Sequence, residues 1–425
     1  MHLLTFLEDA EYQETTFVWR NKHHTSRFAP VASVNFLKAD HLIVFLTNQA
    51  FKRVYSDFAN ELPSDLSVQT VEIPPGATQE EHWRIAQLVN RSVDSGTEIS
   101  FDISHGPLCF PLVGLLTATF MRAARNLELQ HILYAAYGLD TGLEVENLAN
   151  LPPYKTPIFD LNEMLTWLEW FIATERFNNT GDARNLSTLL QAERKRLTRS
   201  FRDDAARLSE MGSLGKLRGV ITGLSRSLQM IRPNQSLQYI ADLPERIKNV
   251  EGLFTSESNN LIYSLLVDRL ESNFDPFTGS ILLNAGNAAS RVKNERWLVN
   301  WYAERELWVE AITLAREWVI NWCMYQLGLE KFTDLPNRRR IESVLGAEAH
   351  DFLESRKKKL AFHSLFMREI PQLDDLLGLW LELTDVRNDI NHAGMREKPG
   401  KPEELQARIQ SCVKLINSLP VNLSR

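Results

Sequence analysis

The stretch EISFDISHGPLCFPLVGLL, residues 98–116, decides the fold of the N-terminal part of the chain. Its apolar first half is typical of a strand that ends at Asp102 or Ile103, and its second half is typical of a helix that begins near Cys109. A strand followed at once by a helix is the repeating unit of an α/β domain. The stretch therefore predicts an open α/β sheet whose strands end at polar turns.

The same alternation continues on both sides of this stretch. Apolar runs predict further strands at HLLTFL, HLIVFLT, VQTVEIP and HILYAAY. Amphipathic stretches predict helices over about residues 50–61, 79–94 and 109–126. Runs as uniformly apolar as these suit a parallel sheet that is covered on both faces. We therefore expect residues 1–160 to form an α/β domain with a mainly parallel sheet.

Polar residues gather where two of these strands end. Ser104, His105 and Gly106 form the turn after one strand, and Thr47 and Asn48 follow another. Open α/β sheets bind ligands at the carboxyl ends of their strands, and a helix N-terminus favours phosphate. The five residues are therefore ligand candidates, although the same residue types are also common in turns and helix caps. Neither G-x-G-x-x-G nor a Walker lysine loop occurs, so ordinary dinucleotide or ATP binding is not supported.

The rest of the chain is helical in pattern. After the proline-containing segment LPPYKTPIFD, residues 161–292 predict several helices, and residues 293–425 begin with a stretch rich in tryptophan. The tryptophans of this stretch are Trp297, Trp301, Trp308, Trp318 and Trp322. Their spacing keeps one helical face. We interpret the stripe as the packed core of an all-α domain, with a ligand-stacking surface as the alternative.

Composition excludes several classes of protein. The formal net charge of −7 argues against a general nucleic-acid coat protein, although a local basic face is compatible with it. Cys109, Cys323 and Cys412 lie far apart, so neither a disulfide framework nor a thiolate zinc site is indicated. No apolar run approaches the roughly 20 residues that span a bilayer, and the start does not resemble a signal peptide. We expect a cytoplasmic protein without a metal site.

A second informative stretch is LTDVRNDINHAG, residues 383–394, where a helix ends in a dense set of polar side chains. Asn388 and His392 are four residues apart and share a helical face. Arg387 lies five residues before His392, and its long side chain can extend around the helix to the same face. Gly394 is expected at the C′ position, which places His392 in the last helical turn.

This helix end has two interpretations. An imidazolium and a guanidinium beside an RNA phosphate can polarise the phosphoryl oxygens and stabilise charge as a neighbouring 2′-hydroxyl attacks. That reaction requires no metal. The same residues also suit an ordinary polar helix end, and the residues alone leave both possibilities equally open. Asp389 is expected to be a structural partner for a nearby cation in either case.

The order of motifs along the chain resembles CRISPR-associated ribonucleases of type III systems, which join a CARF domain to a HEPN domain. LLTFLEDAEYQETTFVW, LIVFLTNQAF, VEIPPGATQEEHWRI, ISFDISHG and TPIFDLNEMLTWLEWFIATERFNNTGDARNL look like successive motifs of the CARF-containing part. WYAERELWVEAITLAREWVI followed by VRNDINHAG resembles the HEPN part, whose motif is Arg, usually Asn, and then His a few residues later. The resemblance covers nearly the whole chain, and the middle helices match least.

The resemblance implies a Rossmann-like CARF domain over residues 1–160, a helical connector over 161–292 and a HEPN domain over 293–425. In such proteins the CARF domain binds cyclic oligoadenylate, and this switches on cleavage of single-stranded RNA. The resemblance also implies metal-independent cleavage that leaves a cyclic phosphate, at a composite site of a homodimer. Besides the allosteric activator, no cofactor is implied.

The resemblance assigns catalysis to Arg387, Asn388 and His392, with Asn388 orienting His392 or the phosphate. Two other arginine-to-histidine spacings also satisfy the motif, Arg125 to His131 and Arg356 to His363. The first of these falls at a helix-to-strand turn, and the second begins in a run of charges. Context therefore selects the third spacing, from Arg387 to His392, in the stretch RNDINH.

Two loops depart from the family pattern. Glu8, Asp9 and Ala10 stand where such proteins usually carry a glycine-rich loop, and Leu108 replaces an arginine of the other loop. Carboxylates close to a polyanionic ring repel it unless they point away. The alternative function is therefore a non-catalytic or differently gated CARF-type regulator or scaffold. A third possibility, motivated by His105, is that the CARF domain cleaves its own messenger.

Overall fold

The computed structural model divides into two compact units, Met1–Leu168 and Glu169–Arg425. It describes residues 1–125, 127–137, 155–202, 204–253, 263–264, 266–270, 273–274, 287–358 and 370–421. No helix within these ranges is long and apolar enough to cross a membrane. The division expected at residues 160 and 292 is finer than these two units and stays a prediction.

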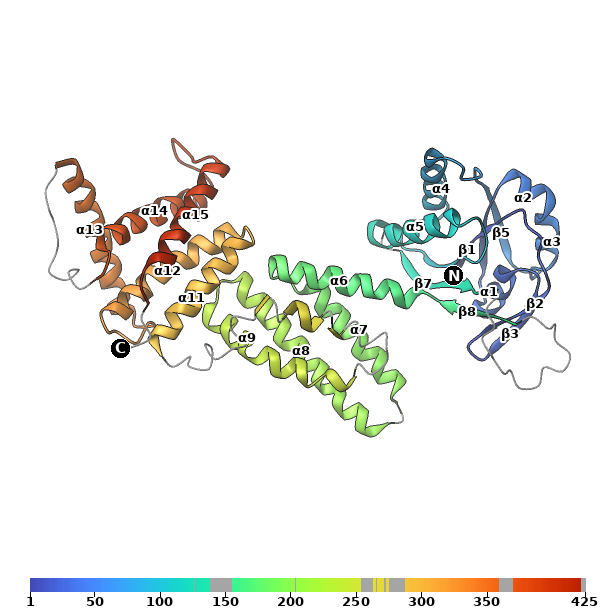
Figure 1. Cartoon of the computed structure of the whole chain (residues 1–425), viewed down its shortest axis with the longest axis horizontal. Coiled ribbons are helices and arrows are strands. Elements are labelled where there is room, and N and C mark those ends of the chain that lie inside the picture. Colours follow the sequence, from blue (N-terminus) through green and yellow to red (C-terminus); the bar gives the residue numbers. More distant parts are fainter. Residues whose placement is uncertain are drawn as a thin grey trace. The chain divides into compact units, whose positions relative to one another are not determined.

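The described part of the first unit forms one eight-stranded sheet in the order β3-β2-β8-β7-β6-β1-β4-β5 (Figure 1). The strands are β1 (His2–Leu7), β2 (Thr15–Trp19), β3 (Lys22–Ser26), β4 (His41–Leu46), β5 (Ser67–Glu72), β6 (Glu98–Asp102), β7 (Glu128–Ala135) and β8 (Lys155–Asp160). From β7 to β5 all neighbours run parallel, whereas β7 pairs antiparallel with β8 and β2 antiparallel with β3. The expected α/β fold with a mainly parallel sheet is confirmed.

Helices pack on both faces of this sheet. They are α1 (Ala29–Leu37), α2 (Asn48–Arg53), α3 (Tyr55–Asn60), α4 (Gln79–Arg91) and α5 (Cys109–Arg125). Leu4 and Phe6 of β1 share a buried core with residues of α4 and α5, whereas Leu3 and Leu7 share the opposite core with residues of α1, α2 and α3. Successive side chains of a strand point to opposite faces, so a strand buried on both faces is apolar throughout.

The elements that the sequence patterns missed are α1, β2, β3 and β8. The helix α1 begins at Ala29 without a side-chain cap, and Pro30 lies in its first turn. The strand β3 reads KHHTS and β8 contains Pro157, so neither shows the apolar alternation of a strand. The helix expected over residues 50–61 is two helices, because the backbone at Val54 leaves helical geometry.

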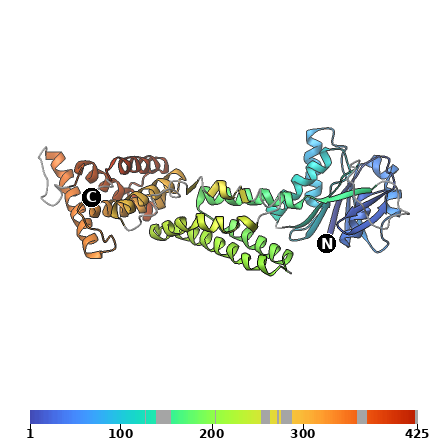
Figure 2. The same cartoon turned by 60° about the horizontal axis from the view of Figure 1, so that its bottom comes forward.

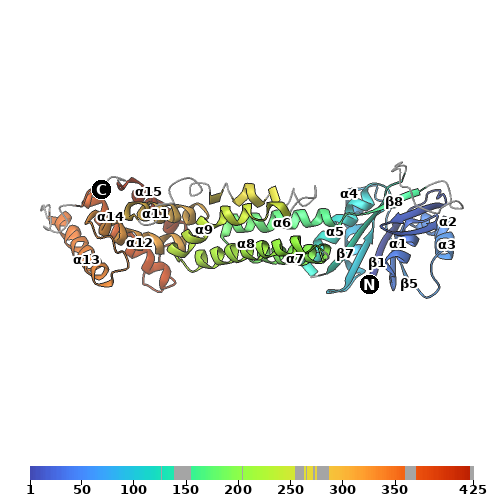
Figure 3. The same cartoon turned by 90° about the horizontal axis from the view of Figure 1, so that it is seen from below.

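The described part of the second unit is helical, as expected. Its elements are α7 (Arg184–Ser200), α8 (Ala205–Gln229), α9 (Pro233–Lys248), the 3₁₀ turn η1 (Glu251–Leu253), α11 (Ala288–Glu304), α12 (Trp308–Gln326), α13 (Leu335–Lys358), α14 (Leu373–Asn391) and α15 (Pro402–Ser418). The helix α6 (Asn162–Thr180) crosses the boundary between the units. Figures 2 and 3 show α7 and α8 side by side, and these two helices pack against each other.

The tryptophans form part of the core of the second unit. Trp301, Trp318 and Trp322 are fully buried, and their indole N–H groups donate to the Asn273 side chain, the Val292 carbonyl and the Pro420 carbonyl. The interpretation of these three as a helical core is therefore confirmed. The stripe does not follow one helix, however, because α11 ends at Glu304 and α12 begins at Trp308.

Candidate functional site

The polar end of α14 is held in place by a buried apolar face. Leu376, Leu383 and Val386 of α14 are fully buried, and the helix packs against α12, α13 and α15. Because buried positions recur every three to four residues, the intervening positions near the end of the helix face outward. Arg387, Asn388 and His392 occupy these outward or partly outward positions.

The helix ends in a Schellman motif. The Gly394 N–H donates to the Asp389 carbonyl at 2.9 Å, and the Ala393 N–H donates to the Ile390 carbonyl at 2.9 Å. His392 is the C-cap, and Ala393 follows it with φ 52°. The expectation that Gly394 occupies the C′ position is therefore wrong by one residue. Ala393 holds C′, and Gly394 is the next residue, with φ 68°.

Ala393→Gly is expected to raise the free energy of unfolding by about 1 kcal/mol, because a Cβ disfavours left-handed backbone and glycine lacks one. Ala407→Gly is a matched control at an exposed position inside α15, where glycine should lower stability by about 1 kcal/mol. Chemical denaturation of both variants measures the difference. Equal losses in the two variants would contradict the left-handed conformation of Ala393.

Asp389 anchors this helix end from inside. Its side chain is 3% exposed and accepts hydrogen bonds from Arg396 Nη1 at 3.2 Å and from the Gly400 N–H at 2.9 Å. One turn earlier, Asp385 accepts from Arg396 at 2.9 Å and from Arg408 at 2.7 Å. The Arg408 hydrogen bond holds the pKa of Asp385 below its usual range. The expectation that Asp389 pairs with a nearby cation is confirmed.

Arg387, Asn388 and His392 lack such partners. Asn388 and His392 are exposed and Arg387 is half-buried. None of the three side chains forms a hydrogen bond or ion pair with another residue that the structure describes. A guanidinium, an amide and an imidazole therefore lie within one helix end, and the neighbouring Asp389 carboxylate is already hydrogen-bonded to Arg396 and Gly400. Such a set can hold a phosphate from outside the chain.

Of the two competing arginine-to-histidine pairs, the structure describes the histidine of one. His131 lies in β7, and its Nδ1 is 2.6 Å from Asp160 Oδ2 at the end of β8. His363 lies outside the described residues. Within the described residues, no group of three or more His, Cys, Asp or Glu side chains is arranged to hold a metal ion.

The ligand candidates of the first unit meet at one edge of the sheet. The strands β4 and β6 flank β1 in parallel, so their carboxyl ends lie at the same edge. Thr47 is the N-cap of α2, and its hydroxyl accepts the Ala50 N–H at 3.2 Å. Asn48 begins α2 and is exposed. The Ser104 hydroxyl accepts the Ala135 N–H at 2.9 Å. Thr47 and Ser104 thus have structural partners in addition to any ligand role.

His105 is turned into the unit. Its side chain is 4% exposed, and its Nε2 accepts the N–H of Ala29, the first residue of α1, at 3.2 Å. The Tyr12 ring meets the His105 ring edge-on at 4.8 Å between centroids. Burial lowers the pKa of His105 to about 3, so its ring is neutral near pH 7. Gly106 has φ 112°, and a Cβ there would lie 2.9 Å from Phe110. Both residues therefore shape the turn after β6.

Two carboxylates at this edge have partners that the sequence did not reveal. Asp9 accepts from Arg53 at 2.7 Å and from Gln49 at 2.5 Å, so a guanidinium matches its charge. Asp102 is fully buried and accepts from the Ser33 hydroxyl and from the Ser104 N–H. Burial raises the pKa of Asp102. Its only sequence signal was an acidic residue at the end of an apolar strand.

The chain was compared with protein-family models, with curated proteins and with solved structures. No protein-family model matches the chain. The CRISPR-associated protein MJ1674 of Methanocaldococcus jannaschii is 25% identical over 205 residues, which are 47% of this chain and 30% of that protein. The match thus spans less than a third of the relative's length. Enterococcus italicus Csm6, solved with cyclic hexa-2′-fluoro-hexa-dAMP, aligns with a TM-score of 0.43 and 9% identity over 98% of this chain and 92% of that chain. Over about half of its length, the chain is therefore similar to a CRISPR-associated protein.

Proposed function

We propose that the chain is an endoribonuclease of CRISPR antiviral defence that cleaves single-stranded RNA in the cytoplasm when cyclic oligoadenylate binds its first unit. The observation that carries the proposal is the set of half-buried Arg387 and exposed Asn388 and His392, whose side chains have no partner among the described residues. The spacing of the set matches the HEPN motif. The similarity to a CRISPR-associated protein supports the same biological context.

The chemistry follows from the residue types. In the proposed reaction the 2′-hydroxyl of the RNA attacks the adjacent phosphorus, and the bond to the 5′-oxygen of the next nucleotide breaks. Arg387 stabilises the charge on the phosphoryl oxygens, His392 in its protonated form gives a proton to the leaving 5′-oxygen, and water takes up the proton that the attacking 2′-hydroxyl loses. Asn388 orients His392 or the phosphate. The products are a 2′,3′-cyclic phosphate and a 5′-hydroxyl, and no metal is required because the RNA supplies the nucleophile.

A homodimer would place two such sets together. One set supplies a single imidazole and a single guanidinium, and twofold symmetry doubles both. The first unit carries a surface that suits self-association. Leu108 lies just before α5 and Leu112, Leu116 and Phe120 lie within it, four residues apart and 82%, 50%, 65% and 59% exposed. Exposed apolar side chains in a row along one helix face are characteristic of an interaction surface.

Leu116→Glu is expected to weaken the dimer about 100-fold, because symmetry places two carboxylates in an apolar contact at a cost of about 3 kcal/mol. Sedimentation velocity over a range of protein concentrations measures the change. Phe51→Glu is the matched control, since Phe51 is 50% exposed on α2, which packs on the other face of the sheet. An unchanged dimer dissociation constant in Leu116→Glu would show that α5 does not form the dimer interface.

The proposed function is tested by cleavage of end-labelled single-stranded RNA in EDTA, with and without cyclic tri-, tetra- or hexa-adenylate. We expect one ring to stimulate cleavage, because a ligand activates only if it binds the active state more tightly than the inactive one. Cleavage that no ring changes would show a nuclease with a different sensor. Failure to cleave under every condition would contradict the nuclease proposal.

A second candidate function is a non-catalytic or differently gated regulator. It is favoured by the turn after β6 in the first unit, where His105 is neutral and its Nε2 is engaged with the Ala29 N–H. The same engagement argues against a role for His105 in cleaving a bound messenger. Titration calorimetry with each cyclic oligoadenylate distinguishes the candidates. Absence of binding to all of them would favour the regulator, and tight binding of one would count against it.

A further inference from the structure

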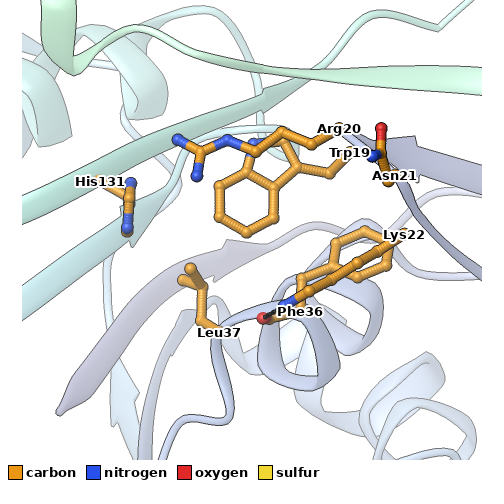
Figure 4. A pocket seen from close by; sticks show the side chains of 7 residues that line it. All are labelled: Trp19, Arg20, Asn21, Lys22, Phe36, Leu37 and His131. Carbon is orange, nitrogen blue, oxygen red and sulfur yellow. Dashed lines mark hydrogen bonds between the residues drawn. The ribbon is translucent and has the colours of Figure 1, made fainter. Parts of the chain in front are cut away.

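A cavity in the first unit lies apart from both candidate sites. It encloses about 410 Å³ between the β2–β3 hairpin, the end of α1 and β7 (Figure 4). The lining residues that matter for its chemistry are Trp19, Arg20, Lys22, Phe36, Leu37 and His131. Its volume falls within the range of small-molecule pockets.

The helix α1 separates this cavity from the loops at the carboxyl edge of the sheet. It begins at Ala29, whose N–H bonds to His105, and it ends at Leu37, which lines the cavity. A helix rises 1.5 Å per residue, so the two ends of α1 are roughly 12 Å apart. The cavity is therefore a different place from the ligand candidates at Thr47 and Ser104.

Cations dominate the polar part of the lining. The Arg20 guanidinium lies 4.6 Å from the centre of the Trp19 ring, and Lys22 Nζ lies 5.8 Å from it. Lys22 Nζ also donates to the Phe36 carbonyl at 2.7 Å, which fixes the ammonium at the end of α1. No acidic residue lines the cavity within the described part of the chain. The cavity therefore favours an anionic ligand.

Asp160 fixes the orientation of the His131 ring. Its Nδ1 lies 2.6 Å from Asp160 Oδ2, and Asp160 also accepts the N–H groups of Ile132 at 3.2 Å and Asn162 at 3.1 Å. A carboxylate fixed in this way accepts a hydrogen bond from Nδ1–H of His131. The other ring nitrogen, Nε2, is then available to a ligand. The ring also contacts Trp19 edge-on at 5.4 Å between centroids.

The backbone at Arg20 is strained. Trp19 pairs with Lys22, so Arg20 and Asn21 form a two-residue hairpin turn. Arg20 has φ 56°, and Asn21 is not among the residues with positive φ. A positive φ at the first turn position alone is the pattern of a type II′ turn, which favours glycine there. A strained residue that places its side chain in a cavity points to a functional requirement for that side chain.

We propose that this cavity binds a nucleoside monophosphate. The phosphoryl group is held by the cations of Arg20 and Lys22 and by His131 Nε2. The base lies against the apolar part formed by Phe36 and Leu37. An inorganic anion would leave that apolar lining and most of the volume unused. The proposal does not depend on RNA cleavage, because none of these residues belongs to the α14 cluster.

The test is titration calorimetry of the full chain with AMP, GMP, CMP and UMP, and with the nucleoside of whichever binds. We expect at least one nucleotide to bind with a Kd below about 1 mM, a range typical of weak but specific small ligands. Its nucleoside should bind at least tenfold more weakly. Lys22→Ala and His131→Ala should each weaken binding about tenfold. Lys52→Ala, an exposed lysine on α2, should not change it.

Arg20→Gly separates an effect on nucleotide binding from an effect on folding. Glycine relieves the positive φ, so the variant should melt about 2–4 °C above the wild type, while its nucleotide affinity falls about tenfold or more. Higher stability with lower affinity cannot come from a damaged fold. The proposal is overturned if none of the four nucleotides binds at millimolar concentration, or if Arg20→Gly and Lys22→Ala bind as the wild type does.

Discussion

Replacing His392 with alanine is expected to reduce the rate of RNA cleavage by about 10²- to 10⁴-fold, the usual contribution of a general acid or base. The imidazole is exposed and has no partner among the described residues, so its removal should change the free energy of unfolding by less than about 1 kcal/mol. Single-turnover cleavage of end-labelled RNA at saturating activator measures the rate, and thermal melting measures the stability.

Asn391→Ala is the matched control for this experiment. Asn391 precedes His392 at the same helix end and is also exposed, but it lies outside the proposed set. Its replacement should leave the rate nearly unchanged. Arg387→Lys should still lower the rate, because an ammonium keeps the charge but loses the two-pronged hydrogen bonding of a guanidinium. Cleavage by His392→Ala at the wild-type rate would contradict the assignment.

Asp389→Ala is expected to lower the free energy of unfolding by about 2–3 kcal/mol, somewhat less than the cost of breaking a fully buried pair. The Asp389 side chain is buried, and its loss leaves the Gly400 N–H and one side of Arg396 without their acceptor. The cost stays below that of breaking a fully buried pair because the Arg396 side chain is 40% exposed and water can solvate it. Chemical denaturation of the full chain measures the effect.

Asp385→Ala is the control, because Asp385 is 43% exposed and its ion pairs with Arg396 and Arg408 should contribute less than about 1 kcal/mol. Asp389→Asn should lie between the two, since an amide oxygen still accepts the Gly400 N–H. Denaturation of Asp389→Ala at the wild-type midpoint would show that this carboxylate does not anchor the helix end.

Local patterns predicted those parts of the fold that local sequence determines. The apolar runs of β1, β4 and β6 predicted strands, because each is buried on both faces. The hairpin of β2 and β3 was missed because β3 is polar and because β2 pairs with β8, which lies more than a hundred residues away. The single tryptophan stripe was wrong because periodicity does not reveal the turn between Glu304 and Trp308.

The candidate sites divide in the same way. Arg387, Asn388 and His392 lie within one helix end, so their grouping follows from spacing alone. The bond from Asp389 to Gly400 depends on a loop that returns to the helix, and the bond from Ala29 to His105 joins residues 76 positions apart. Sequence spacing and context therefore grouped Arg387, Asn388 and His392. They could not show that His105 faces inward or that Arg20 and His131 share a cavity.

The proposed chemistry is tested most directly by the ends of the RNA products. Two matched substrates are incubated in EDTA with the activating ring, one all-ribose and the other with 2′-deoxyribose at each cleaved position. The account predicts that only the all-ribose RNA is cleaved, leaving a 2′,3′-cyclic phosphate and a 5′-hydroxyl, and that His392→Ala removes this product. Cleavage of both substrates, or a product with a 3′-hydroxyl, would contradict it.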